Sequence, residues 1–131
     1  MGQEVSRYAV AGLLGLASLI GCALQAPMRL VEADSGKLLT LERGQLLEIH
    51  LEGQGGTGYQ WTRTGTPAGV LVAEGPAEII QAQDARPGQA HEEIWRFRGD
   101  KPGTELLTLE YRRQWENTAP VRTLSVQVTV R

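Results

Sequence analysis

Residues 124–130 read Leu-Ser-Val-Gln-Val-Thr-Val, an unbroken alternation of apolar and polar side chains. Successive side chains of a β-strand point to opposite faces, so this pattern predicts a strand with one buried and one exposed face. The same alternation occurs at residues 47–52 and again at 107–112. Three such segments spread along the chain predict an all-β fold.

Weaker strand signals lie between these segments, at residues 28–32, 59–64, 77–82 and 92–98. In the last of them, Trp95 and Phe97 are expected to share one face of the strand. Turn-forming residues, mostly glycine and proline, separate the candidates at residues 42–44, 53–58, 65–69, 86–88, 101–103 and 117–120. About seven or eight short strands punctuated in this way predict an immunoglobulin-like β-sandwich.

The composition is that of an ordinary globular protein, and 131 residues fit one domain. A formal charge of −2 gives no clustered basic face for nucleic acid or for an anionic membrane surface. The single cysteine, Cys22, cannot form an internal disulfide. The domain therefore rests on its hydrophobic core, for which roughly 105 residues are enough.

Residues 1–21 are predicted to be a signal peptide rather than part of the fold. A polar start that includes Arg7 is followed by 13 apolar or small residues, Tyr8–Ile20, which are too few to span a bilayer. The segment ends in Leu19-Ile20-Gly21-Cys22, which resembles the bacterial lipoprotein processing motif. The resemblance implies cleavage before Cys22 and lipidation of that cysteine. The alternatives are a plain signal peptide with an incidental cysteine, and a buried first helix, which the lack of a polar face disfavours.

This interpretation divides the chain into a removed signal peptide (1–21), a lipidated tether (22–27) and a sandwich domain (28–131). Acyl chains on Cys22 are expected to anchor the domain stably to the cell envelope, since two or more chains bind membranes firmly. Ala23 after the cysteine, by resemblance to such lipoproteins, favours the outer membrane. The domain is then expected to face either the periplasm or the cell surface.

No group of residues in the sequence predicts catalysis, a bound metal or a cofactor. His50 and His91 have no second ligand at metal-binding spacing, and His50 is expected to be exposed and inert on its strand. The glycine-rich residues 53–58 are not followed by the Gly-Lys-Ser/Thr of a phosphate-binding loop. Glu92 and Glu93 are adjacent in a strand, so they point to opposite faces. We therefore predict that the protein is not an enzyme.

Three loops carry the unusual residues. Residues 53–58 contain four glycines before Tyr59-Gln60-Trp61, residues 85–89 form a second loop, and Trp115 appears where the strand pattern of 107–112 ends. Aromatic side chains and arginines on loops are typical anchors of protein interfaces. The alternative is that the tryptophans cap the core, which is favoured for Trp61 inside a strand and disfavoured for Trp115.

Together the three loops resemble those of the chagasin family, the immunoglobulin-like inhibitors of papain-like cysteine proteases. Residues 57–61, Thr-Gly-Tyr-Gln-Trp, match the second half of the family pattern Asn-Pro-Thr-Thr-Gly-Tyr/Phe-x-Trp, in which Gln54, Gly55 and Gly56 replace the first three residues. Residues 111–116, Tyr-Arg-Arg-Gln-Trp-Glu, match Tyr-x-Arg-Pro-Trp-Glu with Gln114 in place of proline. In the glycine-rich second loop, Gly88 is the clear match.

The resemblance implies a reversible, noncovalent inhibitor that fills the active-site cleft of a papain-like protease as a one-to-one complex of a monomer. The first loop would lie over the catalytic cysteine, with the Thr57 hydroxyl near the dyad, Trp115 as an apolar anchor and Arg113 as a planar set of donors. The implied protease-binding residues come from all three loops: Gln54, Gly55, Gly56, Thr57, Gly58, Tyr59, Arg86, Pro87, Gly88, Gln89, Arg113, Gln114 and Trp115.

Several questions stay open at the level of sequence. The target protease could belong to the same cell, to a host or to a competitor. The main alternative function is an envelope-anchored binding or adhesion module on the same fold, and a structural envelope protein without a soluble ligand is the third. Gly55 and Gly56 in place of Pro-Thr predict a less restricted first loop, unless a glycine there adopts a positive φ.

Overall fold

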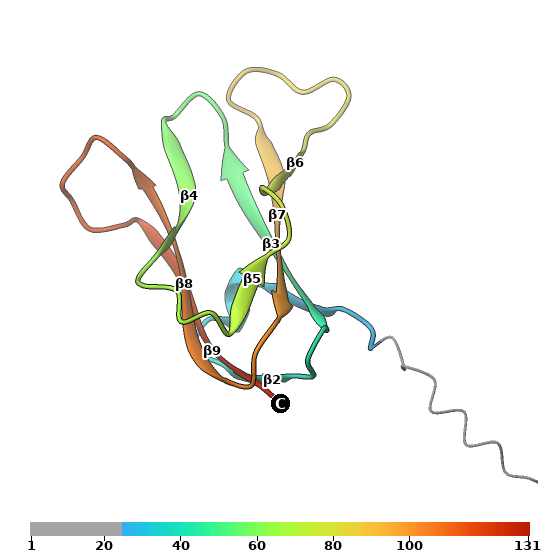
Figure 1. The fold of residues 1–131 in the computed structure, drawn as a ribbon. Coiled ribbons are helices and arrows are strands. Elements are labelled where there is room, and N and C mark those ends of the chain that lie inside the picture. The colour runs from blue at the N-terminus through green and yellow to red at the C-terminus, as the bar shows by residue number, and fades with distance from the viewer. Residues whose placement is uncertain (1–24) are drawn as a thin grey trace, which may run out of the picture.

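The computed structural model describes residues 25–131, which form two β-sheets packed face to face (Figure 1). The strands and the single 3-10 turn are β1 (Met28–Val31), η1 (Glu32–Asp34), β2 (Leu38–Leu41), β3 (Leu46–Gln54), β4 (Tyr59–Thr64), β5 (Leu71–Ala73), β6 (Glu78–Ile80), β7 (Ala90–Gly99), β8 (Gly103–Arg113) and β9 (Arg122–Val130). The expected signal peptide and Cys22 lie outside the described residues. Within residues 25–131, no helix is long and apolar enough to cross a membrane.

Each sheet is built on two long antiparallel strands. One sheet has the order β1-β3-β7-β5, with β6 also paired to β7, and the other has the order β2-β9-β8-β4. The short strands β1 and β2 pair in parallel with β3 and β9, whereas all other pairs are antiparallel. The β3–β4 connection joins the two sheets, whereas the β6–β7 connection stays within the first sheet and the β8–β9 connection within the second. The predicted immunoglobulin-like sandwich is confirmed.

The core lies between the sheets and is made by alternate residues of the long strands. Those buried almost completely are Leu41, Leu47, Ile49, Leu51, Phe97, Leu107, Leu109, Leu124, Val126, Val128 and Val130. They include the leucine, isoleucine and valine positions of the three alternating segments that predicted strands. Each such side chain stabilises the fold by about 1.5–3 kcal/mol relative to an exposed one.

The strand count differs from the sequence prediction because two short strands were missed. Leu38–Leu41 shows no alternation of polar and apolar residues, and Leu71–Ala73 is only three residues long. Both are held by pairing with long strands, β9 and β7 respectively, rather than by a pattern of their own. Residues 25–131 therefore form nine strands rather than seven or eight. Trp95 and Phe97 share a face as expected, with ring centroids 6.3 Å apart.

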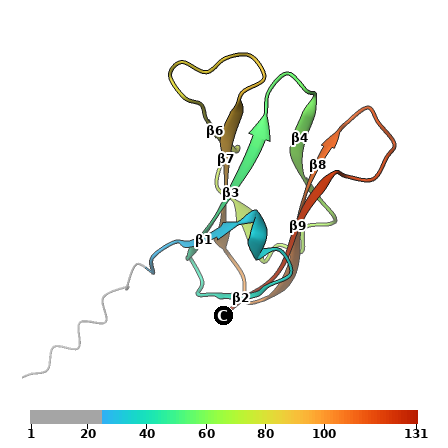
Figure 2. The same cartoon turned by 180° about the vertical axis from the view of Figure 1, so that it is seen from behind.

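The two ends of the sandwich differ. Three connections lie side by side at one end, with β3–β4 between β6–β7 and β8–β9 (Figures 1 and 2). We call them the first loop (residues 54–58), the second loop (81–89) and the third loop (114–121). The described chain begins at the opposite end, because Met28 pairs with Leu47 near the start of β3.

Candidate functional site

The first loop owes its shape to two glycines and one hydroxyl. Gly56 and Gly58 have φ angles of +77° and +80°, a backbone conformation that other residues rarely adopt. The Thr57 hydroxyl donates to the carbonyl oxygen of Gln54 at 2.9 Å and accepts from the backbone N–H of Tyr59 at 3.3 Å. The hydroxyl proton expected to face a protease dyad is therefore engaged inside the loop.

Arg113 joins the third loop to the first. Its Nε donates to the carbonyl oxygen of Thr57 at 2.8 Å, and its Nη1 lies 3.0 Å from a Glu116 carboxylate oxygen. The guanidinium lies 4.5 Å from the centre of the Tyr59 ring. The hydrogen bond to Glu116 raises the pKa of Arg113 further. Two of the five guanidinium N–H donors expected to face a protease are thus used within the molecule, because the neighbouring carbonyl and carboxylate lie within their reach.

Trp115 and Trp61 have opposite environments. The Trp115 side chain is exposed at 72%, and its ring lies against Gly58, where an added Cβ would come within 2.2 Å of Cη2. Trp61 is exposed at only 4%, and its Nε1 donates to the carbonyl oxygen of Glu52 at 3.1 Å. The structure places Trp61 in the core and leaves Trp115 available at the loop end. Gln114 turns away from this surface, since its side chain donates to the Thr62 hydroxyl.

Gln54 joins the first loop to the second. Its side-chain Nε2 donates to the carbonyl oxygen of Gly88 at 2.8 Å. The second loop is closed by a local turn, in which Gln89 donates from its backbone N–H to the carbonyl oxygen of Arg86 and accepts from the Arg86 N–H through its side chain. Arg86, Pro87, Gly88 and Gln89 are all exposed. The expected contact residues of the second loop therefore form one protruding turn beside the first loop.

A pocket of about 430 Å³ lies beneath the first loop, between the sheets. Its walls include Trp61, Trp95 and a polar pair that sequence reasoning missed, His91 and Glu93. Glu93 is only 8% exposed and accepts a hydrogen bond from Trp95 Nε1 at 3.1 Å. The sequence does indicate the position of Glu93, because residues 93, 95 and 97 alternate along one strand and therefore share the face that points to the core.

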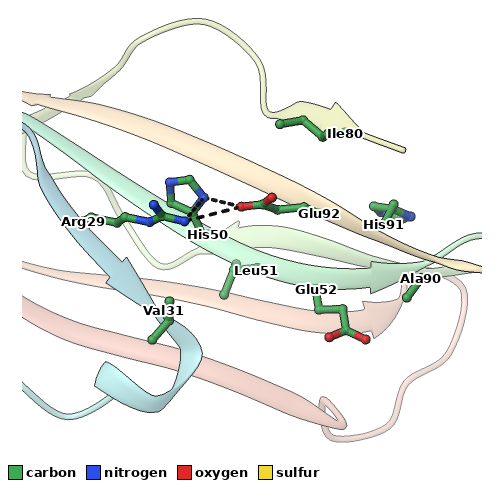
Figure 3. A pocket seen from close by; sticks show the side chains of 9 residues that line it. All are labelled: Arg29, Val31, His50, Leu51, Glu52, Ile80, Ala90, His91 and Glu92. Carbon is green, nitrogen blue, oxygen red and sulfur yellow. Dashed lines mark hydrogen bonds and ion pairs between the residues drawn. The ribbon is translucent and has the colours of Figure 1, made fainter. Parts of the chain in front are cut away.

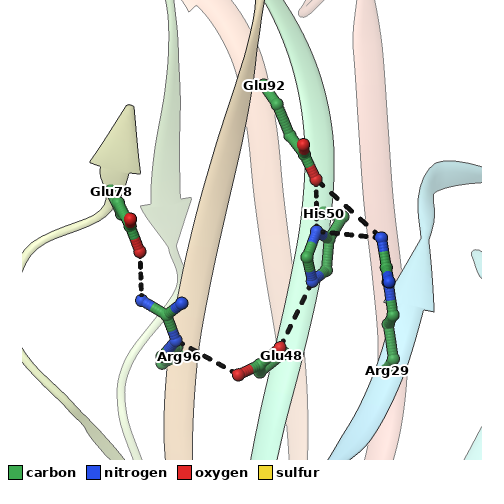
Figure 4. A network of polar contacts seen from close by, with 6 residues as sticks. All are labelled: Arg29, Glu48, His50, Glu78, Glu92 and Arg96. Atoms are coloured by element: carbon green, nitrogen blue, oxygen red, sulfur yellow. Dashed lines mark hydrogen bonds and ion pairs between the residues drawn. The ribbon is translucent and has the colours of Figure 1, made fainter. Parts of the chain in front are cut away.

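His50 corrects a sequence expectation. Its side chain does point to the outer face of its sheet, where it lines a second pocket that Figure 3 shows, but it is only 11% exposed. Its Nδ1 contacts Glu92 and its Nε2 lies 3.3 Å from a Glu48 oxygen, within the polar network of Figure 4. The side chains of neighbouring strands cover the imidazole. Glu92 and Glu93 point to opposite faces of β7, as predicted.

The same network changes the acidity of Glu48. Hydrogen bonds with His50, and next with Arg96, hold the pKa of its carboxyl below the ordinary value. Arg96 also donates to Glu78 at 2.7 Å, so the polar contacts extend from β3 across β7 to β6. Over residues 25–131, no group of three or more His, Cys, Asp and Glu side chains is arranged to hold a metal ion.

The fold and the loop end define a class: an immunoglobulin-like β-sandwich that presents three adjoining loops for contact with another molecule. Comparison with known proteins gives the family. Residues 40–130 match the model of the chagasin family peptidase inhibitors I42, and the chain belongs to this family. Its members are inhibitors, so the expectation that the protein is not an enzyme is confirmed.

Solved structures agree with this assignment. The cysteine protease inhibitor EhICP2 from Entamoeba histolytica is 25% identical, with a TM-score of 0.71 over 81% of this chain and 96% of its own. Amebosin is 27% identical, with a TM-score of 0.68 over 82% of this chain and all of its own. PbICP-C, solved in complex with falcipain-2, is 20% identical, with a TM-score of 0.53 over 82% and 100%. No curated protein matches the sequence significantly.

Proposed function

We propose that this protein is a reversible, noncovalent inhibitor of papain-like cysteine proteases that occludes the active-site cleft with its three loops. The observation that carries the proposal is the joined loop end: the first loop lies between the other two and is bonded to both. The family is one of peptidase inhibitors, EhICP2 is a cysteine protease inhibitor, and PbICP-C was solved with falcipain-2.

The mechanism follows from the shape of the loop end. The first loop is central and rich in glycine, so its backbone can approach the catalytic residues closely. The second loop and Trp115 flank it and would grip the two walls of the cleft. Trp115 offers a large apolar surface whose ring already lies on Gly58, so little freedom is lost on binding. The three loops carry no cysteine, and the Thr57 hydroxyl is hydrogen-bonded within the first loop, so inhibition works by exclusion of substrate.

The experiment is a titration of papain with the purified protein. We expect competitive, one-to-one inhibition, recovery of intact inhibitor, and binding to a protease whose catalytic cysteine is replaced by alanine. A covalent adduct, or obligatory cleavage within residues 53–58, would overturn the occlusion mechanism. A folded protein that leaves papain and cathepsin-like proteases fully active would instead favour the envelope binding module.

We also propose that Cys22 is lipidated and holds the inhibitor in the cell envelope, in the outer membrane. The supporting observation is the motif Leu19-Ile20-Gly21-Cys22 at the end of an apolar run. Two or more acyl chains on this residue give stable anchoring, which one chain does not.

A further inference from the structure

We propose that Gln54 is a positioning residue that fixes the second loop beside the first and so sets the opening between them. The inference rests on the proposed inhibitory function, which gives that opening its role. The family pattern has asparagine at this position. The glutamine side chain is longer by one methylene group, and this length lets its amide reach the second loop.

The second loop has few other attachments. Its hydrogen bonds outside the strand ladder are local: Ala85 donates to Ala82, and Arg86 and Gln89 bond each other. Within the described chain, the bond from Gln54 Nε2 to Gly88 is the one that joins residues 81–89 to another loop. The strand that precedes this loop, β6, is only three residues long. One hydrogen bond therefore has a large influence on where the second loop lies.

Gln54 itself is held firmly. Its backbone N–H donates to the Tyr111 hydroxyl at 3.0 Å, and its carbonyl oxygen accepts the Thr57 hydroxyl. It also forms the last pair of the β3–β7 ladder, with Ala90. Tyr111 is buried, so the main chain of Gln54 is fixed to the core while its side chain reaches over solvent to the second loop.

The first and second loops lie close together where this bond joins them, and they enclose a recess. The ideal Cβ position of Gly56 lies 4.0 Å from the backbone nitrogen of Gly88, and both glycines have positive φ. A recess of about 310 Å³ beside them is lined by residues of both loops, including Gly55, Arg86 and Pro87. A part of the protease that enters this recess meets walls whose separation Gln54 sets. The residue thereby contributes to the choice of target.

The length and chemistry of the side chain can be tested separately. Asparagine is shorter by one carbon–carbon bond, about 1.5 Å, which takes its amide out of reach of Gly88. Glutamate keeps the length but, when ionised, has no proton to donate. Gln127→Ala provides the matched control, since Gln127 is an exposed glutamine on β9, outside the three loops.

The experiment measures amide hydrogen exchange of residues 81–89 in the free full-length chain, together with papain association and dissociation rates. For Gln54→Asn and Gln54→Glu, we expect exchange in the second loop to quicken about two- to tenfold, the effect of one hydrogen bond. Papain affinity should fall by a similar factor. Gln127→Ala should change neither quantity.

A pH comparison separates positioning from a merely structural role. At about pH 3–4 the carboxyl of the Gln54→Glu variant gains a proton, so its exchange relative to the unmodified protein should recover, whereas Gln54→Ala should not recover. Unchanged exchange in both Gln54→Asn and Gln54→Glu would overturn the inference. If the unmodified protein fails to inhibit papain but the exchange results hold, the proposed function fails and the positioning role stands.

Discussion

At the scale of single residues, Gly58 and Trp115 act as one feature. Trp115 is exposed, yet its ring has a defined place because Gly58 has no side chain to keep it away. An exposed tryptophan that is already ordered is a strong candidate for an interface anchor, since binding removes little of its freedom.

We predict that Gly58→Ala weakens papain inhibition about as much as Trp115→Ala, roughly thirtyfold or about 2 kcal/mol. The added methyl group would overlap the indole and displace it. Measured inhibition constants for both variants check this. The control is Gly65→Ala, where φ is +85° and the Cβ site is open, so it carries the same backbone strain without touching Trp115.

Two outcomes would contradict this account of Trp115. The first is equal loss of inhibition in Gly65→Ala and Gly58→Ala, which would make backbone strain the cause. The second is a large fall in thermal stability for Trp115→Ala, which would place the indole among the residues that hold the core together.

Gly55 and Gly56 are adjacent but differ in what they permit. Gly56 has φ +77°, whereas Gly55 lies outside the positive-φ glycines and has open space at its Cβ site. We predict that Gly55→Ala raises the free energy of unfolding by about 0.4–1 kcal/mol, and that Gly56→Ala lowers it by about 1–2 kcal/mol. Urea unfolding of the two variants decides, and the opposite order would refute it. The family's threonine at position 56 would be strained here for the same reason.

At the scale of elements, the outer face of β3 and β7 carries a network of charged side chains beside the buried side chain of Ile94. Glu48 lies between His50 and Arg96, and Glu92 covers the other side of the imidazole (Figure 4). Because the pKa of Glu48 is lowered in the folded state, its contribution is present above the unfolded value of about 4.3 and is lost as pH falls through the folded value.

We therefore predict that Glu48→Gln lowers the free energy of unfolding at pH 7 by about 0.5 kcal/mol, a small amount because solvent screens the site. The difference from the unmodified protein should shrink as pH falls from 7 to 3, because the native carboxyl gains a proton as pH falls through its lowered pKa. Urea unfolding at the two pH values measures both quantities. A deficit that persists at pH 3 would show that packing of the side chain, rather than its charge, is responsible.

The strands also show how much of the fold can be predicted from the sequence. The strands around residues 47–52, 107–112 and 124–130 are clear because burial on one face imposes alternation. The short strands β2 and β5 escape prediction because they are held by neighbours. Likewise, the loop motifs locate the loop end, but the bonds from Arg113 to Thr57 and from Gln54 to Gly88 join residues 34 or more positions apart in sequence. The exposure expected of His50 follows from the alternation of its own strand, whereas the side chains of neighbouring residues bury it.

At the scale of the whole molecule, the proposed lipidation of Cys22 makes a definite prediction. Cys22→Ser should abolish lipidation and leave the precursor unprocessed or soluble, while papain inhibition by the folded domain stays unchanged. Membrane fractionation and intact mass of the two proteins measure this. A variant that stays membrane-bound at unchanged mass would refute lipidation, and the matched change Ser35→Ala within the described domain should leave fractionation as it is.

The chain enters the sandwich at the end opposite the loops, and this arrangement has a consequence for an anchored inhibitor. β3 alone spans the distance between the two ends, and nine residues of strand extend about 30 Å. Loops held that far from a lipid surface lie several Debye lengths of about 8 Å beyond the headgroup charges. An arriving protease would therefore be met without interference from the bilayer's own potential. The local concentration of an inhibitor anchored in this way would depend on its density in the membrane rather than on dilution into the surrounding fluid.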